Sequence, residues 1–429
     1  MPVKEIHDTA IRPERAFVVG VRDGDVRILE AESLLRELIG LADSLGVETV
    51  GSAMVVLRDR NPAYLTGTGK ADELAAAAKA VEADSIIFDR ALSPVQQRNW
   101  EELSGLSVYD RAELIIKIFA SRAHTREASL QVELARLQYA LPRLSHSYED
   151  LHRQKGGRYG TKGSGEQKLE LDRREIKRRI ADIKEELIAV RKNRETQRKK
   201  RERLELPRAA IVGYTNAGKS SILNALAKAE VLAVDKLFAT LDPTTRRMST
   251  PSGPVLLTDT VGFVRNLPHG LVEAFKATLE ETADADLLVH VLDASDPECD
   301  IQHETTRAVL AEIGVGEAKA LVVYNKIDRV QDRTVLEFMA RRHPGAVFIS
   351  AKTGEGLVEL KDAIGAALAL DAKEMQLLIP PAEYAVVAML YREASILSEE
   401  HREEGTLLRC LVPVRLVPRI QAYSFSSLT

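Results

Sequence analysis

The segment GYTNAGKS, from Gly213 to Ser220, has the spacing of a phosphate-binding loop. It follows the apolar run AAIV and precedes SSILNALAKA, which predicts the strand–loop–helix context that such a loop needs. Its glycines allow backbone N–H groups to turn inward and surround phosphate oxygens at a helix N-terminus. Lys219 can reach the terminal phosphates, and the Ser220 hydroxyl can coordinate Mg²⁺. A chain of this length can match the loop by chance, so the other motifs decide its meaning.

Three further motifs each follow an apolar run. DTVG occupies Asp259 to Gly262 after VLL, NKID occupies Asn325 to Asp328 after LVVY, and SAK occupies Ser350 to Lys352 after VFI. Ligands of open α/β sheets bind at the carboxyl ends of the strands, where these motifs are expected to lie. Four motifs in this order and context predict a guanine-nucleotide site.

The DTVG motif is expected to supply contacts to the metal ion and to the γ-phosphate. Asp259 is predicted to hold Mg²⁺ through water, and the Gly262 N–H to contact the γ-phosphate. A further hydroxyl ligand for Mg²⁺ is expected from the segment LFATLDPTTRR, where Thr240 is the first choice and Thr244 and Thr245 are the alternatives. LDPTT is also a good turn sequence. The predicted metal ligands are Ser220, Thr240 and Asp259, and the predicted catalytic residues are Lys219, Thr240 and Gly262.

NKID and SAK predict the choice of base. Asp328 can accept hydrogen bonds from N1–H and the exocyclic amine of guanine, and adenine offers neither donor. Asn325 can brace the loop, the Lys326 stem can cover the base, and the Ala351 N–H can meet the guanine carbonyl oxygen. GTP or GDP with Mg²⁺ is therefore expected. The predicted nucleotide-binding residues are Gly213, Tyr214, Thr215, Asn216, Ala217, Gly218, Lys219, Ser220, Ser221, Asp259, Thr260, Val261, Gly262, Asn325, Lys326, Asp328, Ser350, Ala351 and Lys352.

Phe263 stands where many GTPases carry a glutamine that orients the attacking water. A phenyl ring can neither donate nor accept that hydrogen bond. Slow hydrolysis by the chain alone is expected, with stimulation by groups that a partner supplies. One hypothesis is that Phe263 faces away from the nucleotide until a bound partner orders residues 259–267. A second is that Asn216 helps to bind K⁺, as an asparagine there can do in related GTPases.

The elements around these motifs predict an α/β protein with four parts. Strand-like and helical runs alternate in residues 1–125 and again in the G domain, residues 205–371, whose continuous apolar strands are typical of a mainly parallel sheet. Residues 372–429 predict a small α+β domain, with a helix YAVVAMLYREASIL and a strand GTLLRCLVPVRL. GTGK at residues 67–70 lacks the first glycine of a phosphate-binding loop and is interpreted as a turn before a helix.

Residues 126–204 predict an antiparallel helical hairpin with a glycine-rich tip. Apolar residues recur at heptad-like spacing on both sides of RQKGGRYGTKGSGEQ, although two helices packed on separate domains would also fit. The tip carries Lys155, Arg158, Lys162 and Tyr159, which suit insertion into folded RNA. A disordered connector is the alternative. The basic run RKNRETQRKKRERLELPR is either a solvated helix or a phosphate-backbone contact.

Composition limits the other classes of function. The net charge of −4 places any nucleic-acid contact in a local patch, and two cysteines without metal or disulfide spacing suit a reducing compartment. The absence of a signal-like N-terminus and of a long apolar run predicts a cytoplasmic protein without a membrane span. A monomer is expected.

Beyond the nucleotide motifs, the chain resembles the HflX family of ribosome-associated GTPases. YLTGTGKADEL, FDRALSPVQQRNWEE, DRAELIIKIFASRAHTREASLQVELARLQYALPRL, GSGEQKLELDRR and LFATLDPTTRR are similar to that family's signatures. At the tip, Ser164 and Gln167 replace the family's usual proline and threonine. The resemblance implies binding to the large ribosomal subunit and its RNA, with GTP-dependent separation of subunits on stalled ribosomes. The family has also been associated with ATP at the N-terminal domain, for which residues 1–125 show no specific motif.

The sequence therefore predicts a ribosome-associated GTPase that promotes subunit separation. One alternative is a regulatory nucleotide-binding module on RNA or the ribosome, with negligible turnover. Another is a tRNA-modification GTPase, although the chain ends in SFSSLT without a cysteine motif for that chemistry.

Overall fold

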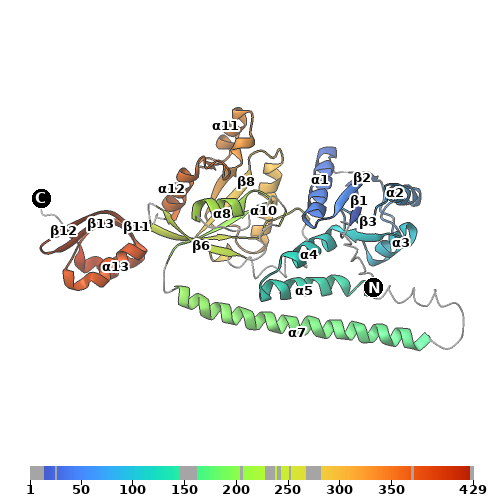
Figure 1. The fold of residues 1–429 in the computed structure, drawn as a ribbon, viewed down its shortest axis with the longest axis horizontal. Coiled ribbons are helices and arrows are strands. Elements are labelled where there is room, and N and C mark those ends of the chain that lie inside the picture. Colours follow the sequence, from blue (N-terminus) through green and yellow to red (C-terminus); the bar gives the residue numbers. More distant parts are fainter. Residues whose placement is uncertain are drawn as a thin grey trace, which may run out of the picture. The chain divides into compact units, whose positions relative to one another are not determined.

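The computed structural model describes residues 14–24, 27–144, 162–202, 206–227, 237–238, 243–250, 253–266, 282–368 and 372–425. The chain divides into two compact units, Met1–Leu187 and Ile188–Thr429. Figure 1 shows both units, with many of their helices and strands labelled. The bounds of the four domains predicted from the sequence stay predictions.

The first unit begins with a four-stranded parallel sheet in the order β2-β1-β3-β4. Its strands are β1 (Arg15–Asp23), β2 (Glu48–Leu57), β3 (Ser85–Phe88) and β4 (Ser107–Asp110). Helix α1 (Ile28–Ser44) packs beside α4 (Arg111–Arg122), and α2 (Thr68–Ala80) packs beside α3 (Pro94–Ser104). The core includes Trp100, whose indole N–H donates to the Tyr64 carbonyl at 2.9 Å. The predicted alternation of strands and helices is confirmed.

The GTGK segment is a helix start in this unit. Helix α2 begins at Thr68, with Gly67 as its N-cap, so Gly69 and Lys70 lie inside the helix. The Lys70 ammonium pairs with Glu73 at 2.7 Å, one turn along the same helix. The prediction that this segment is no phosphate loop agrees with this geometry.

The helical hairpin is formed by α5 (Arg126–Ala140) and α7 (Lys162–Glu202). Arg126, at the start of α5, pairs with Glu186 at 3.1 Å, and Glu133, farther along α5, pairs with Arg179, which comes earlier in α7, at 2.9 Å. The partners therefore follow opposite orders along α5 and α7, which shows that the two helices are antiparallel. On α7, the heptad positions 176, 180, 183, 187 and 190 are buried or half-buried, as the seam predicts. Residues 145–161 of the tip lie outside the described residues, as do the side chains of 191–205.

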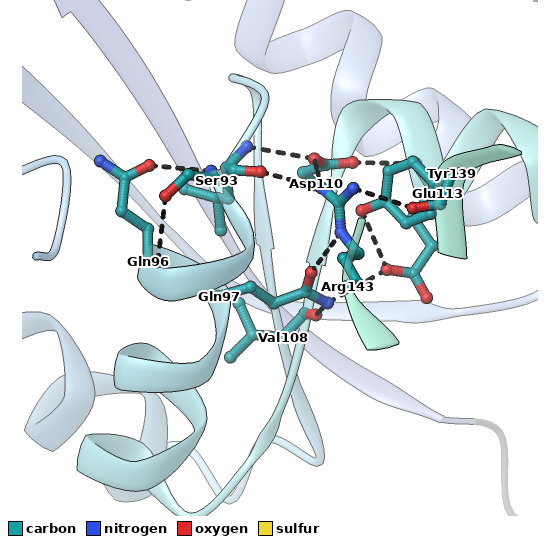
Figure 2. Close-up of polar contacts among 9 residues, drawn as sticks. Ser93, Gln96, Gln97, Val108, Asp110, Glu113, Tyr139 and Arg143 are labelled. Carbon is teal, nitrogen blue, oxygen red and sulfur yellow. Dashed lines mark hydrogen bonds and ion pairs between the residues drawn. The ribbon is translucent and has the colours of Figure 1, made fainter. Parts of the chain in front are cut away.

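A polar network ties the end of α5 to the sheet domain (Figure 2). The Arg143 guanidinium donates to the Gln97 amide oxygen at 2.9 Å and to the Leu92 carbonyl at 2.8 Å, and it lies 3.3 Å from the Asp110 carboxylate. It also stacks over the Tyr139 ring, with its central carbon 3.5 Å from the ring centroid. Asp110 is also the N-cap of α4, so one buried carboxylate joins both helices to the sheet.

The G domain in the second unit has a six-stranded sheet in the order β10-β9-β8-β5-β7-β6. All neighbouring strands are parallel except β6 (Thr244–Thr250), which pairs antiparallel with β7 (Gly253–Asp259). The others are β5 (Arg208–Gly213), β8 (Leu287–Asp293), β9 (Ala320–Asn325) and β10 (Val347–Phe348). Its helices are α8 (Lys219–Ala227), α10 (Cys299–Glu312), α11 (Arg333–Arg342) and α12 (Leu357–Leu368). The predicted mainly parallel sheet is confirmed, whereas strand β6 was not predicted.

The C-terminal part is α+β, as predicted, but its strands differ in extent. Strands β11 (Ala372–Ile379), β13 (Gly405–Pro413) and β12 (Ser395–Arg402) form an antiparallel sheet in that order. Helix α13 (Tyr384–Glu393) ends before Ala394, so the predicted helix through Leu397 was wrong at its end. Ile396 pairs with Cys410 of β13, which shows that sheet pairing replaces the helix there.

Candidate functional site: a guanine-nucleotide site

The phosphate loop lies between β5 and α8, as the sequence predicts. Gly213 has φ +150, and a Cβ there would lie 2.3 Å from the Val291 carbonyl oxygen of β8. Gly218 has φ +93, and a Cβ there would lie 2.2 Å from the Asn325 amide nitrogen. Both glycines are therefore required by backbone conformation and by close neighbours. Asn216 has φ +61 and is exposed at the loop surface.

Lys219 lies inside this loop. Its ammonium donates to the Tyr214 carbonyl at 2.8 Å and to the Gly213 carbonyl at 3.2 Å. Burial lowers the pKa of Lys219 to about 8, and the nearby Asp259 carboxylate opposes that shift. A buried ammonium surrounded by main-chain dipoles is placed to gain strongly from an incoming phosphate.

Ser220, at the start of α8, and Asp259, at the end of β7, lie next to each other beside the phosphate loop. The Ser220 hydroxyl donates to the Asp259 carboxylate at 2.6 Å, although 39 residues separate them in the sequence. Hydroxyl and carboxylate oxygens suit a hard cation such as Mg²⁺. No group of three or more His, Cys, Asp or Glu side chains suited to a metal occurs among the described residues. A magnesium ion here would therefore depend on these two oxygens together with phosphate, water and a further hydroxyl.

The three threonines predicted to supply that further hydroxyl differ in what the structure shows of them. Thr240 lies outside the described residues, so its role stays a prediction. Thr244 begins β6 and pairs with Asp259 across the sheet, and the Thr245 hydroxyl lies 2.9 Å from that of Thr258. The Thr245 hydroxyl is therefore engaged in a contact between strands β6 and β7 in this structure, and the choice between Thr240 and Thr244 stays a prediction.

The base-recognition motifs lie side by side at the ends of β9 and β10. The Asn325 amide donates to the Ala217 carbonyl of the phosphate loop at 2.8 Å, and its oxygen accepts from the Ala351 N–H at 3.0 Å. Asn325 thus braces two loops, as predicted. The Ser350 hydroxyl donates to Asp328 at 2.7 Å, which orients this exposed carboxylate. The Ala351 N–H expected for the guanine carbonyl is the one that Asn325 holds here.

Lys326 is held by a residue that the motifs did not reveal. It adopts φ +64, and its ammonium pairs with Asp293, at the end of β8, at 2.7 Å. This ion pair holds the end of the Lys326 side chain, whose stem is the part predicted to cover the base. Asp293 closes the apolar strand LLVHVLD, and a carboxylate at a strand end is the sequence signal that could have indicated it.

The switch segment after β7 is also ordered against the phosphate loop. Thr215 N–H donates to the Phe263 carbonyl at 2.8 Å, and Phe263 N–H donates to the Gly213 carbonyl at 3.1 Å. The Phe263 residue is 2% exposed. A Cβ on Gly262 would lie 2.9 Å from the Lys219 ammonium, so Gly262 directly faces that group. Thr260 and Val261, which link Asp259 to Gly262, are buried. As far as Arg265, hydrogen bonds within the protein hold this segment. The hypothesis that a partner orders residues 259–267 stays a prediction.

Comparison with known proteins identifies the chain. Family models described as GTP-binding GTPase N-terminal, GTP-binding GTPase Middle Region and 50S ribosome-binding GTPase match residues 32–120, 122–201 and 208–326. The chain is 46% identical over 431 residues to GTPase HflX of Akkermansia muciniphila, covering 98% of this chain and 99% of that protein. It is 43% identical over 383 residues to GTPase HflX of Escherichia coli strain K12, covering 89% and 90%. The chain belongs to the GTPase HflX family.

A solved structure of SsGBP with GDP aligns at a TM-score of 0.49 and 26% identity, over 83% of this chain and 98% of that chain. Membership of the HflX family confirms the resemblance found in the sequence. This HflX chain is a GTPase that binds GTP. No helix in the described part of the chain is long and apolar enough to cross a membrane.

Proposed function

We propose that this HflX GTPase binds the large ribosomal subunit and its RNA and promotes the separation of subunits on stalled ribosomes. The observation that carries the proposal is that Lys219, Ser220, Asp259 and Gly262 lie together beside a buried Phe263, which stands in place of a water-orienting amide. Such a site holds GTP well and hydrolyses it slowly until a partner supplies the missing groups. The family model described as a 50S ribosome-binding GTPase supports the ribosome as that partner. A cytoplasmic monomer is part of the same proposal.

In this mechanism Lys219 holds the β- and γ-phosphates, and Gly262 contacts the γ-phosphate through its N–H. Ser220, Thr240 and Asp259 would hold Mg²⁺, which neutralises charge on the phosphate oxygens when bound. Asp328 selects guanine. K⁺ near Asn216 is proposed as a second ion, because this exposed side chain lies in the phosphate loop. Turnover measured in K⁺ and in Na⁺ tests this point, and identical rates would exclude it.

The main experiment measures GTP turnover with increasing large ribosomal subunits. Stimulation of about 10³-fold or more is expected if the subunit completes the site, with small subunits as the control. Co-sedimentation with GTP, GDP and a non-hydrolysable analogue then tests whether GTP favours the bound state. Flat turnover, with splitting retained in the presence of the analogue, would favour a regulatory binding module instead.

The hairpin tip is proposed to contact ribosomal RNA. Replacing Lys155, Arg158 and Lys162 together by alanine should reduce subunit splitting and spare GTP binding, because these residues are distant in sequence from the nucleotide motifs. A matched control replaces the three arginines Arg333, Arg341 and Arg342 of α11, which removes the same charge elsewhere. Unchanged splitting in the tip variant would contradict the RNA role of the tip.

A further inference from the structure

The phosphate loop reaches the switch segment through a side chain as well as through its main chain. The Tyr214 hydroxyl accepts a hydrogen bond from the main-chain N–H of Arg265 at 2.8 Å. Tyr214 is 3% exposed, so this bond is shielded from water. The main chain of Phe263 is bonded to Gly213 and Thr215, which flank Tyr214. Tyr214 therefore holds the switch at a second point, two residues beyond Phe263.

The Arg265 side chain fixes the other end of this contact. Its guanidinium forms an ion pair with Glu298 at 3.2 Å, and both side chains are nearly buried. Glu298 lies just before α10, in a turn where its own N–H donates to Asp296 at 2.9 Å. The Asp296 carboxylate also accepts from the Gln302 amide at 2.8 Å, one turn into α10. Arg265 thus connects the switch to a turn that is braced from within.

These contacts bracket one glycine. Gly262 lies between Asp259, on the metal side, and the anchored residues Phe263 and Arg265. Its Cα faces Lys219 so closely that a Cβ would be 2.9 Å from the ammonium, and 2.8 Å from the Thr215 methyl group. A small shift of the main chain at Gly262 would therefore change its separation from the group that holds the γ-phosphate.

We propose that Tyr214, Arg265 and Glu298 are positioning residues that set where the Gly262 N–H meets the γ-phosphate. The proposal rests on the proposed role of Gly262 and Lys219 in GTP binding. None of the three side chains needs to touch the nucleotide to act in this way. We call the Tyr214–Arg265 hydrogen bond and the Arg265–Glu298 ion pair together the latch. Because GDP has no γ-phosphate, loss of the latch should lower the affinity for GTP and leave the affinity for GDP almost unchanged.

The test uses the full chain with Tyr214→Phe, which removes only the hydroxyl, and with Glu298→Gln, which removes only the charge. Affinities for GDP and for a non-hydrolysable GTP analogue are measured with Mg²⁺, together with kcat and KM. Loss of the hydroxyl leaves the Arg265 N–H buried without its acceptor, so the ratio of GTP-analogue to GDP affinity should fall about five- to tenfold. A fall in kcat is expected with it, because the γ-phosphate is then held less well.

Tyr324→Phe is the matched control. It removes another buried hydroxyl of the same domain, one that lies 2.7 Å from His343 Nδ1, and it should leave the affinity ratio unchanged. An equal loss of GDP and GTP-analogue affinity in Tyr214→Phe would assign the latch to stability alone. A rise in GTP-analogue affinity would mean that the latch opposes GTP, and an unchanged ratio would mean that it has no role; each overturns the proposal. If the wild-type chain bound GDP and the analogue but gave no response to large subunits, the proposed function would fail while this test still stood.

Discussion

Nucleotide binding by this chain should depend on pH through Lys219. Burial holds the pKa of its ammonium at about 8 without nucleotide. Phosphate oxygens beside that ammonium favour its charged form, so the complex binds more protons than the free protein. The sign follows directly: raising the pH through 8 must weaken binding, because the free lysine loses its proton first.

The size of the effect follows from the two pKa values. If phosphate returns Lys219 to an ordinary pKa of about 10.4, GDP affinity should fall roughly fourfold between about pH 7 and about pH 8.5. At about pH 8, binding should take up roughly half a proton for each nucleotide. The pH range of the test stops at about pH 8.5 because the guanine N1–H itself ionises at higher pH. It starts at about pH 7 because the terminal phosphate of GDP titrates near pH 6.

Calorimetric titrations with GDP in two buffers of different ionisation enthalpy measure the proton uptake directly. Lys219→Arg is the comparison, since a guanidinium keeps its charge throughout this range. Its affinity should be lower but flat with pH. If that variant does not bind, the wild-type uptake alone decides. Uptake near zero at about pH 8, with a flat affinity, would refute the assignment of a lowered pKa to Lys219.

Four further predictions concern the G domain and the hairpin. Asp328→Asn should shift preference from GTP towards xanthosine triphosphate in competition binding, because the amide offers a donor in place of an acceptor; retained GTP preference would remove Asp328 from base recognition. Burial beside two other histidines lowers the pKa of His290 to about 3, so the unfolded chain binds more protons and His290 should cost about 2 kcal/mol of stability at about pH 5; hydrogen exchange of β8 amides should show this loss, and His290→Phe should remove the part that His290 contributes, while the lowered pKa values of His303 and His343 leave a smaller loss. Ile183→Ala, at a fully buried hairpin position, should cost about 2–5 kcal/mol in thermal or urea unfolding, whereas Ile188→Ala, at a position 66% exposed, should cost almost nothing. Phe263→Gln should lower stability without a large gain in intrinsic turnover, since the amide enters a buried position; a tenfold faster rate would show that the missing amide was limiting.

The position of the phosphate loop between a strand and a helix could be predicted because the loop and the apolar run before it form a short, recognisable pattern in the sequence. Gly213 and Gly218 are required by backbone angles and by contacts a few ångströms away, and the motifs mark the ends of strands whose apolar runs are continuous. Strand β6 was missed for the opposite reason. It is an edge strand, and TTRRMST has only one large apolar residue, Met248, so its pairing with β7 leaves no apolar run in the sequence.

Contacts between residues that are distant in the chain could not be predicted from the sequence either. The Arg265–Glu298 pair joins a switch segment to a turn before α10, and no periodic pattern links those positions. The stack of His290 with His303, whose ring centroids lie 4.6 Å apart, joins β8 to α10 in the same way. Such pairs depend on how helices lie on the sheet, which is settled by packing and not by local propensity. The hairpin was predictable because its heptad seam records that packing in the sequence itself.

Phe263 connects these results. A glutamine at this position would need a side chain free to meet water, but the main chain of Phe263 is paired with the phosphate loop on both sides. A buried phenyl ring favours that pairing, because removing apolar surface from water stabilises the docked segment. The same docking places Gly262 against Lys219. Phe263 thus offers no water-orienting group, while its docking fixes the position of Gly262. We therefore expect stimulation to come from groups that a partner adds to this site, rather than from a rearrangement of Phe263 within it.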